Sequence, residues 1–180
     1  MRILGVDPGT RKTGAGLIES YGSHYRLLHW ETIQPNPDFP ISKKLVQIYE
    51  SLLALIRQFR PEILALENVF YGKDLRAMIK IGEARACAML AASAEGIDVV
   101  EYAPARIKQS VSGNGCATKE QIQHMVKTLL KLKSIPPADS SDALAVAICH
   151  LHSFRTGLLA GPAAAKQKSF RPKNKERVWN

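Results

Sequence analysis

Two short apolar segments that each end in a carboxylate restrict what this chain can fold into. Residues 2–6 read RILGV and lead into Asp7, and residues 63–66 read ILAL and lead into Glu67. A continuous apolar run of this length indicates a strand buried on both faces of a sheet. Because Pro8-Gly9-Thr10 is a strong turn signal, the first strand is expected to end at Asp7 and the chain to reverse there.

The order of the remaining patterns predicts an α/β fold. Residues 13–19 and 24–34 are expected to form two strands that continue antiparallel from the first. The later predicted elements are a helix at 45–59, a strand at 63–66, a helix at 74–94, a strand at 97–102, a short helix from Pro104, and helices at 118–131 and 138–154. This order predicts a mixed five-stranded sheet flanked by helices, three antiparallel strands followed by parallel additions, as in the ribonuclease H-like architecture.

Two further carboxylates belong with the first pair. Asp139 and Asp142 lie three residues apart at the start of a predicted helix and therefore share a helix face. If the strands ending at Asp7 and Glu67 are neighbours, all four acids converge. Taken singly, Asp7 can be a turn residue, Asp139 a helix N-cap and Asp142 an acid favoured by the helix dipole. Glu67 has no such simple explanation after an apolar strand.

Four carboxylates in one site repel one another unless a cation neutralises them. Oxygen ligands without histidine or thiolate favour Mg²⁺, with Mn²⁺ as a substitute, over zinc. His150 and His152 are two residues apart on a predicted helix and so do not form a metal pair. Two ions about 4 Å apart would support hydrolysis of a phosphodiester by in-line displacement. The four acids therefore predict a magnesium-dependent phosphodiesterase site.

The distribution of charge predicts a nucleic-acid partner. The net charge is +9, of which residues 158–180 carry six cations against one acid. A second basic zone, residues 101–133, has six cations against two acids. We expect residues 1–156 to form one nuclease domain and residues 157–180 a basic, disordered tail. The absence of a signal or membrane segment predicts a cytoplasmic protein, and three widely spaced cysteines predict reduced thiols.

Two loops carry further candidates. Gly113, Asn114 and Gly115 precede a capping-box pattern at Thr118 and Gln121, so their amides could hold a phosphate, or the segment is only a structural loop. Phe70 and Tyr71 follow Glu67 and precede a polar turn. They could stack on unpaired bases, with core packing as the alternative. A helix rich in small residues near 82–92 fits either packing within the domain or a dimer.

The sequence resembles the RuvC-type Holliday-junction resolvases of bacteria from about residue 2 to 155. The resemblance is carried, in order, by ILGVDPGTRKTGAGLIE, PEILALENVFYGKD, IGEAR, PARIKQSVSGNG, KEQIQHMVKTLL and PPADSSDALAVAICH. It implies that Asp7, Glu67, Asp139 and Asp142 are the catalytic metal ligands. It also implies that Lys108, Lys119 and Phe70 contact DNA, and we add Arg76 behind the two lysines.

The resemblance also implies an activity and partners. It implies a homodimer that nicks two strands symmetrically across a four-way junction and leaves 5′-phosphate and 3′-hydroxyl ends, in recombination and repair. A branch-migration helicase complex is the implied protein partner. Three other hypotheses stay open on the residues alone: an ATP-binding phosphotransferase of the actin-like superfold, a non-catalytic junction-binding protein, and a nuclease acting on hybrids or flaps.

Overall fold

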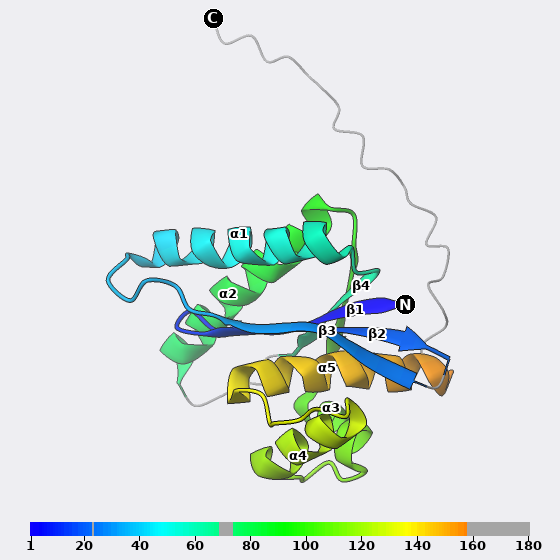
Figure 1. Cartoon of the computed structure of the whole chain (residues 1–180). Helices are drawn as coiled ribbons and strands as arrows, with labels where there is room; N and C mark the ends of the chain where they lie inside the picture. Colours follow the sequence, from blue (N-terminus) through cyan, green and yellow to red (C-terminus); the bar gives the residue numbers. More distant parts are fainter. Residues whose placement is uncertain (23, 69–73, 158–180) are drawn as a thin grey trace, which may run out of the picture.

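Five strands form one mixed sheet in a computed structural model that describes residues 1–22, 24–68 and 74–157 (Figure 1). The strands are β1 (Arg2–Asp7), β2 (Thr13–Tyr21), β3 (His24–Ile33), β4 (Ile63–Glu67) and β5 (Asp98–Tyr102), in the spatial order β3-β2-β1-β4-β5. β1, β2 and β3 pair antiparallel, whereas β4 and β5 extend the sheet in parallel. The predicted fold class is confirmed.

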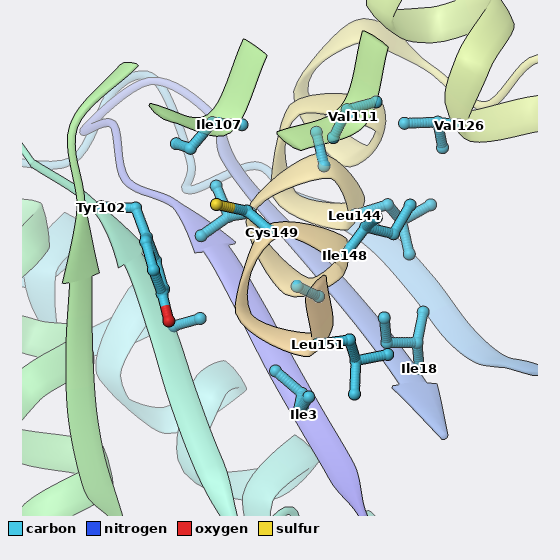
Figure 2. Packing of buried hydrophobic residues seen from close by; sticks show 14 of the residues in the cluster. Ile3, Ile18, Tyr102, Ile107, Val111, Val126, Leu144, Ile148, Cys149 and Leu151 are labelled. Atoms are coloured by element: carbon cyan, nitrogen blue, oxygen red, sulfur yellow. The ribbon is translucent and has the colours of Figure 1, made fainter. Parts of the chain in front are cut away.

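Helices cover both faces of this sheet. α1 (Ile41–Phe59) and α2 (Leu75–Ala94) lie on one face, and α5 (Ala138–Arg155) lies on the other, with α3 (Pro104–Ser112) and α4 (Lys119–Leu129) packed outside it (Figure 1). Each face has its own apolar core. Leu4 and Leu64 point into the core with α1 and α2, whereas Ile3 and Ala65 point into the core with α5. Figure 2 shows Ile148 and Leu151 of α5 facing the strands near Ile3.

Glycines on β1 and β2 let α5 approach the sheet at backbone distance. A Cβ added at Gly5 would lie 2.0 Å from the Ala143 carbonyl oxygen, and one added at Gly14 would lie 1.9 Å from the Asp139 carbonyl oxygen. A Cβ at Gly16 would meet Leu144 at 2.7 Å. The start of α5 is therefore held directly against the strand that ends at Asp7.

The helix ends follow the local signals in the sequence. Asp74 caps α2 by accepting hydrogen bonds from the backbone of Arg76 and Ala77, and Thr118 with Gln121 forms the predicted capping box of α4. α5 begins after Pro137 without a side-chain cap, and Asp139 lies within its first turn. The N-cap explanation of Asp139 is therefore wrong. No helix among the described residues is long and apolar enough to cross a membrane.

Candidate active site

The carboxyl ends of two neighbouring strands and the first turns of α5 bring the predicted acids together. β1 and β4 pair in parallel with Val6 opposite Leu66, so Asp7 and Glu67 end adjacent strands at one edge of the sheet. Asp142 joins them from α5, and these three half-buried side chains line one pocket of about 190 Å³. Lys108 of α3 and Lys119 of α4 line the same pocket.

Burial and mutual repulsion raise the proton affinity of these acids. Burial, followed by the charges of Asp142, Glu67 and Asp139, raises the pKa of Asp7 to about 7. Burial also raises the pKa of Glu67 and of Asp142 above their usual values. A carboxyl group with a raised pKa stays protonated at a pH where an exposed carboxyl group is ionised. Nearby positive charge would favour the ionised form. The cluster is therefore short of a cation.

Lys119 supplies part of that charge. Its Nζ lies 3.5 Å from Oδ2 of Asp142, and its charge lowers the pKa of Asp7, Glu67 and Asp142 against the raising effects. Three quarters of the Lys119 side chain is exposed, so solvent screens this contact and it holds the carboxylate only weakly. Lys108 acts in the same direction on Glu67 and Asp142.

The donor set fits a hard divalent cation. All donors are carboxylate oxygens, which Mg²⁺ and Mn²⁺ prefer, and burial followed by the neighbouring carboxylates raises the pKa of Asp7. Among the described residues, no three acidic, histidine or cysteine side chains are already spaced to enclose an ion. A cation bound here would take its ligands from the strand ends and α5, and their side chains would have to move closer together around it.

Asp139 occupies a different position from the other three acids. Its charge acts on Asp7 and Asp142, but its side chain lines a neighbouring groove together with the turn at residues 9–12. The spacing of three along α5 thus places Asp142 in the pocket and Asp139 at the border between pocket and groove. The structure brings all four predicted acids into electrostatic contact, and three of them into one pocket.

The loop at Gly113, Asn114 and Gly115 connects α3 to α4, the two helices that carry Lys108 and Lys119. Gly113 closes α3 with φ 74°, a conformation that favours glycine. Its amides are already used: the backbone N–H groups of residues 113–117 donate to Gln109 and Ser112 at the end of α3 or to Asn114 in the loop. This pattern favours the structural-loop alternative over amides that wait for a phosphate.

The remaining predicted DNA contacts are less constrained. Arg76 is exposed in the first turn of α2. Phe70 and Tyr71 lie outside the described residues, so the prediction that they stack on bases stays a prediction.

Sequence reasoning missed Arg85, which supports the site from α2. Its Nη1 donates a 2.7 Å hydrogen bond to the backbone oxygen of Glu67, and its guanidinium also forms an ion pair with Glu101 of β5. Arg85 therefore fixes the end of β4, from which the Glu67 side chain projects. Its charge within the IGEAR stretch was visible, but no spacing rule links a residue in the middle of a helix to a strand end eighteen positions earlier.

The fold and the carboxylates together define a class. A mixed sheet with three antiparallel and two parallel strands, acids at adjoining strand ends and further acids on the helix that crosses them, is the arrangement of ribonuclease H-like nucleases.

Comparison with known proteins narrows this class to one family. The family model described as crossover junction endodeoxyribonuclease RuvC matches residues 3–150. Relatives of that name from Desulforamulus reducens and Dehalococcoides mccartyi are 46% and 47% identical over 83% and 86% of this chain, covering 93% and 94% of their own lengths. The chain belongs to the crossover junction endodeoxyribonuclease RuvC family.

Solved structures agree with this assignment. The RuvC structure from Thermus thermophilus matches with a TM-score of 0.80 at 35% identity, covering 87% of this chain and 97% of that one. The same protein in complex with a Holliday junction substrate also matches with a TM-score of 0.80. The yeast mitochondrial Holliday junction resolvase, at 16% identity and a TM-score of 0.60, shows the fold alone.

Proposed function

We propose that this chain resolves four-way DNA junctions by paired, symmetric, divalent-metal-dependent nicks in recombination and repair. The observation that carries the proposal is the pocket in which Asp7, Glu67 and Asp142 gather beside Lys108 and Lys119. Negative side chains that need a cation, next to positive side chains that suit a phosphate, are what phosphodiester hydrolysis requires. Family membership supports the junction as the substrate, since the similar Thermus thermophilus protein has a structure in complex with a Holliday junction substrate.

Each side chain has a proposed role in this reaction. Asp7, Glu67 and Asp142, with Asp139 at the border, would hold Mg²⁺ or Mn²⁺, and we propose two ions. When bound, the metal would make water a better nucleophile and stabilise the charge that develops on the phosphate. Lys108 and Lys119 would orient the scissile phosphate from the α3–α4 side of the pocket. The water oxygen would bond to phosphorus as the bond to the 3′ oxygen breaks, with the water losing a proton to solvent and the 3′ oxygen gaining one, which leaves 5′-phosphate and 3′-hydroxyl ends.

The other proposed DNA contacts flank this centre. Arg76 would bind a DNA phosphate from the start of α2. The loop residues Gly113, Asn114 and Gly115 would contact the sugar–phosphate backbone of the DNA. Phe70 and Tyr71 would stack on bases at the point of strand exchange. We propose that residues 1–156 are the nuclease domain and that residues 157–180 are a basic tail that adds nonspecific affinity.

A stripe on α2 supports the proposed homodimer. The alanines at 84, 88, 91 and 92 are buried in the core with α1, so they serve packing within the domain. The opposite face exposes Leu75, Ile79, Gly82, Ala86 and Leu90, which follow one another at intervals of three or four residues. An exposed apolar stripe of this kind suits a symmetric contact with a second copy. A cytoplasmic location and a branch-migration helicase as a further partner are proposed from the family alone.

The test is cleavage of a labelled four-way junction, compared with linear duplex and RNA–DNA hybrid, with and without Mg²⁺. Paired symmetric nicks on the junction alone, absent without metal and lost in Glu67→Gln, would support the proposal. The matched control is Asp98→Asn, which alters an exposed acid at the opposite end of the sheet and should cut normally. Tight junction binding without cutting under any metal would overturn the proposal in favour of a binding protein.

A further inference from the structure

A groove next to the carboxylate pocket is lined by positive charge that the site described above does not use. It has a volume of roughly 1090 Å³ and is walled by the turn at residues 9–12, the loop after β3, the start of α1 and the first half of α2. Arg11, Lys12, Lys44 and Lys80 line it, against Asp139 as its acid. The groove therefore carries a local excess of three positive charges.

These cations are available to a ligand. Arg11, Lys12 and Lys80 are exposed, and within the described part of the chain none of them forms an ion pair. The ammonium group of Lys44 donates to the backbone oxygen of Pro37, at 2.6 Å. Cations gathered in a concave surface without acidic partners raise the local concentration of anions.

The start of α1 adds a second, independent attraction for anions. α1 is nineteen residues long, its N-cap is Pro40, which makes no side-chain cap, and its first turn contains no acid. The backbone N–H groups of Lys43 and Lys44 donate to the Pro40 oxygen, so what the first turn offers is the positive end of the helix dipole, which no acid compensates at the groove wall where Ile41 and Lys44 lie. Helix starts of this kind accept phosphate oxygens.

The position of the groove relative to the catalytic acids decides what would occupy it. The turn that forms one wall follows Asp7 directly, and Asp139 belongs to the groove while acting electrostatically on Asp7. Lys108 and Lys119 lie in the pocket on the other side of the cluster. A polyanion whose phosphate is held at the carboxylates therefore has positive side chains ahead of it and behind it.

We propose that this groove binds the phosphodiester backbone of the cleaved DNA strand next to the scissile phosphate, with Arg11, Lys12, Lys44 and Lys80 as the contacting cations. The proposal rests on the proposed function, since it needs a DNA strand at the carboxylates. In this arrangement the groove fixes the path by which the strand leaves the site, so that a single phosphate is presented to Asp7.

The experiment compares two double variants that remove the same charge. The groove variant, Arg11→Gln with Lys80→Gln, removes two positive charges from the lining of the groove. The control variant, Lys43→Gln with Arg60→Gln, removes two exposed cations that do not line it. Binding of a fluorescent four-way junction is measured in EDTA across a range of salt concentrations. The slope of log K against log salt should fall by about 1 for each lost phosphate contact in the groove variant and stay unchanged in the control.

A second readout locates the contact on the DNA. Single phosphates near the cut are replaced by neutral methylphosphonates. A replacement that weakens junction binding by the wild-type protein, because it removes a phosphate held by the groove, should not weaken binding by the groove variant any further. Equal salt slopes for the two double variants would overturn the groove assignment. The same holds if every methylphosphonate weakens binding by the groove variant as much as it weakens binding by wild type. Because binding is measured without metal, failure of the wild-type protein to cut junctions would overturn the proposed function separately.

Discussion

The metal-free protein should become more stable when Asp7 is replaced by asparagine, and the gain should grow as pH rises from about 4 to about 7. Burial and three neighbouring carboxylates raise the pKa of Asp7 from 3.8 to about 7. The folded state therefore holds a proton that the unfolded state releases between those values, and its stability falls as pH rises through that window. At about 1.4 kcal/mol for each tenfold change, the full cost above pH 7 is about 4 kcal/mol.

The assay is urea denaturation of wild type and Asp7→Asn in EDTA at pH 4.5, 6 and 8. An amide cannot ionise, so the variant should gain about 2 to 4 kcal/mol over wild type at pH 8 and little at pH 4.5. Saturating Mg²⁺ should raise wild-type stability and narrow the difference, because binding to the folded state stabilises it. Asp98→Asn is the control and should show no such gain. A variant that is less stable at pH 8, or a gain independent of pH, would refute the reasoning.

Three further predictions follow from other contacts. Gly14→Ala should cost about 1 to 3 kcal/mol in urea denaturation and abolish junction cutting, because its Cβ would lie 1.9 Å from the Asp139 carbonyl oxygen; normal cutting would show that α5 adjusts freely. Lys119→Gln should tighten Mn²⁺ binding in calorimetry by roughly threefold to tenfold, because Nζ no longer competes for Asp142; weaker binding would contradict this competition. Removing residues 158–180, which carry five net positive charges, should lower the salt dependence of junction binding, and an unchanged slope would show that they make no DNA contact.

Much of this fold could be predicted because its local signals agree with its tertiary contacts. Pro8-Gly9 after an apolar run marked the end of β1, Thr118 and Gln121 marked the start of α4, and Gly96, with φ 70°, follows α2 as expected of a glycine after a helix. The start of α1 at Ile41 was missed by four residues, because its first turn is exposed and has no apolar period to reveal it.

The structure places the predicted acids close together, but the sequence did not predict how they divide between the pocket and the groove. Acids at the ends of apolar strands stand out, since such residues are costly without a partner. The division between Asp142 in the pocket and Asp139 at the groove depends on how α5 is rotated on the sheet, which periodicity does not define. The contact from Arg85 to the backbone of Glu67 and the groove around Arg11 join segments far apart in sequence. Such long-range neighbours are set by packing alone.

The glycines beneath α5 set the distance between this helix and the sheet. Where Gly5 and Gly14 meet Ala143 and Asp139, main chain rests on main chain, and no side chain acts as a spacer between helix and sheet. The height of α5 above β1 is therefore set at these positions by backbone contact. Relatives in this family should therefore keep glycine at positions 5 and 14, since any side chain there would lift α5 and the carboxylate of Asp142 away from the strand ends.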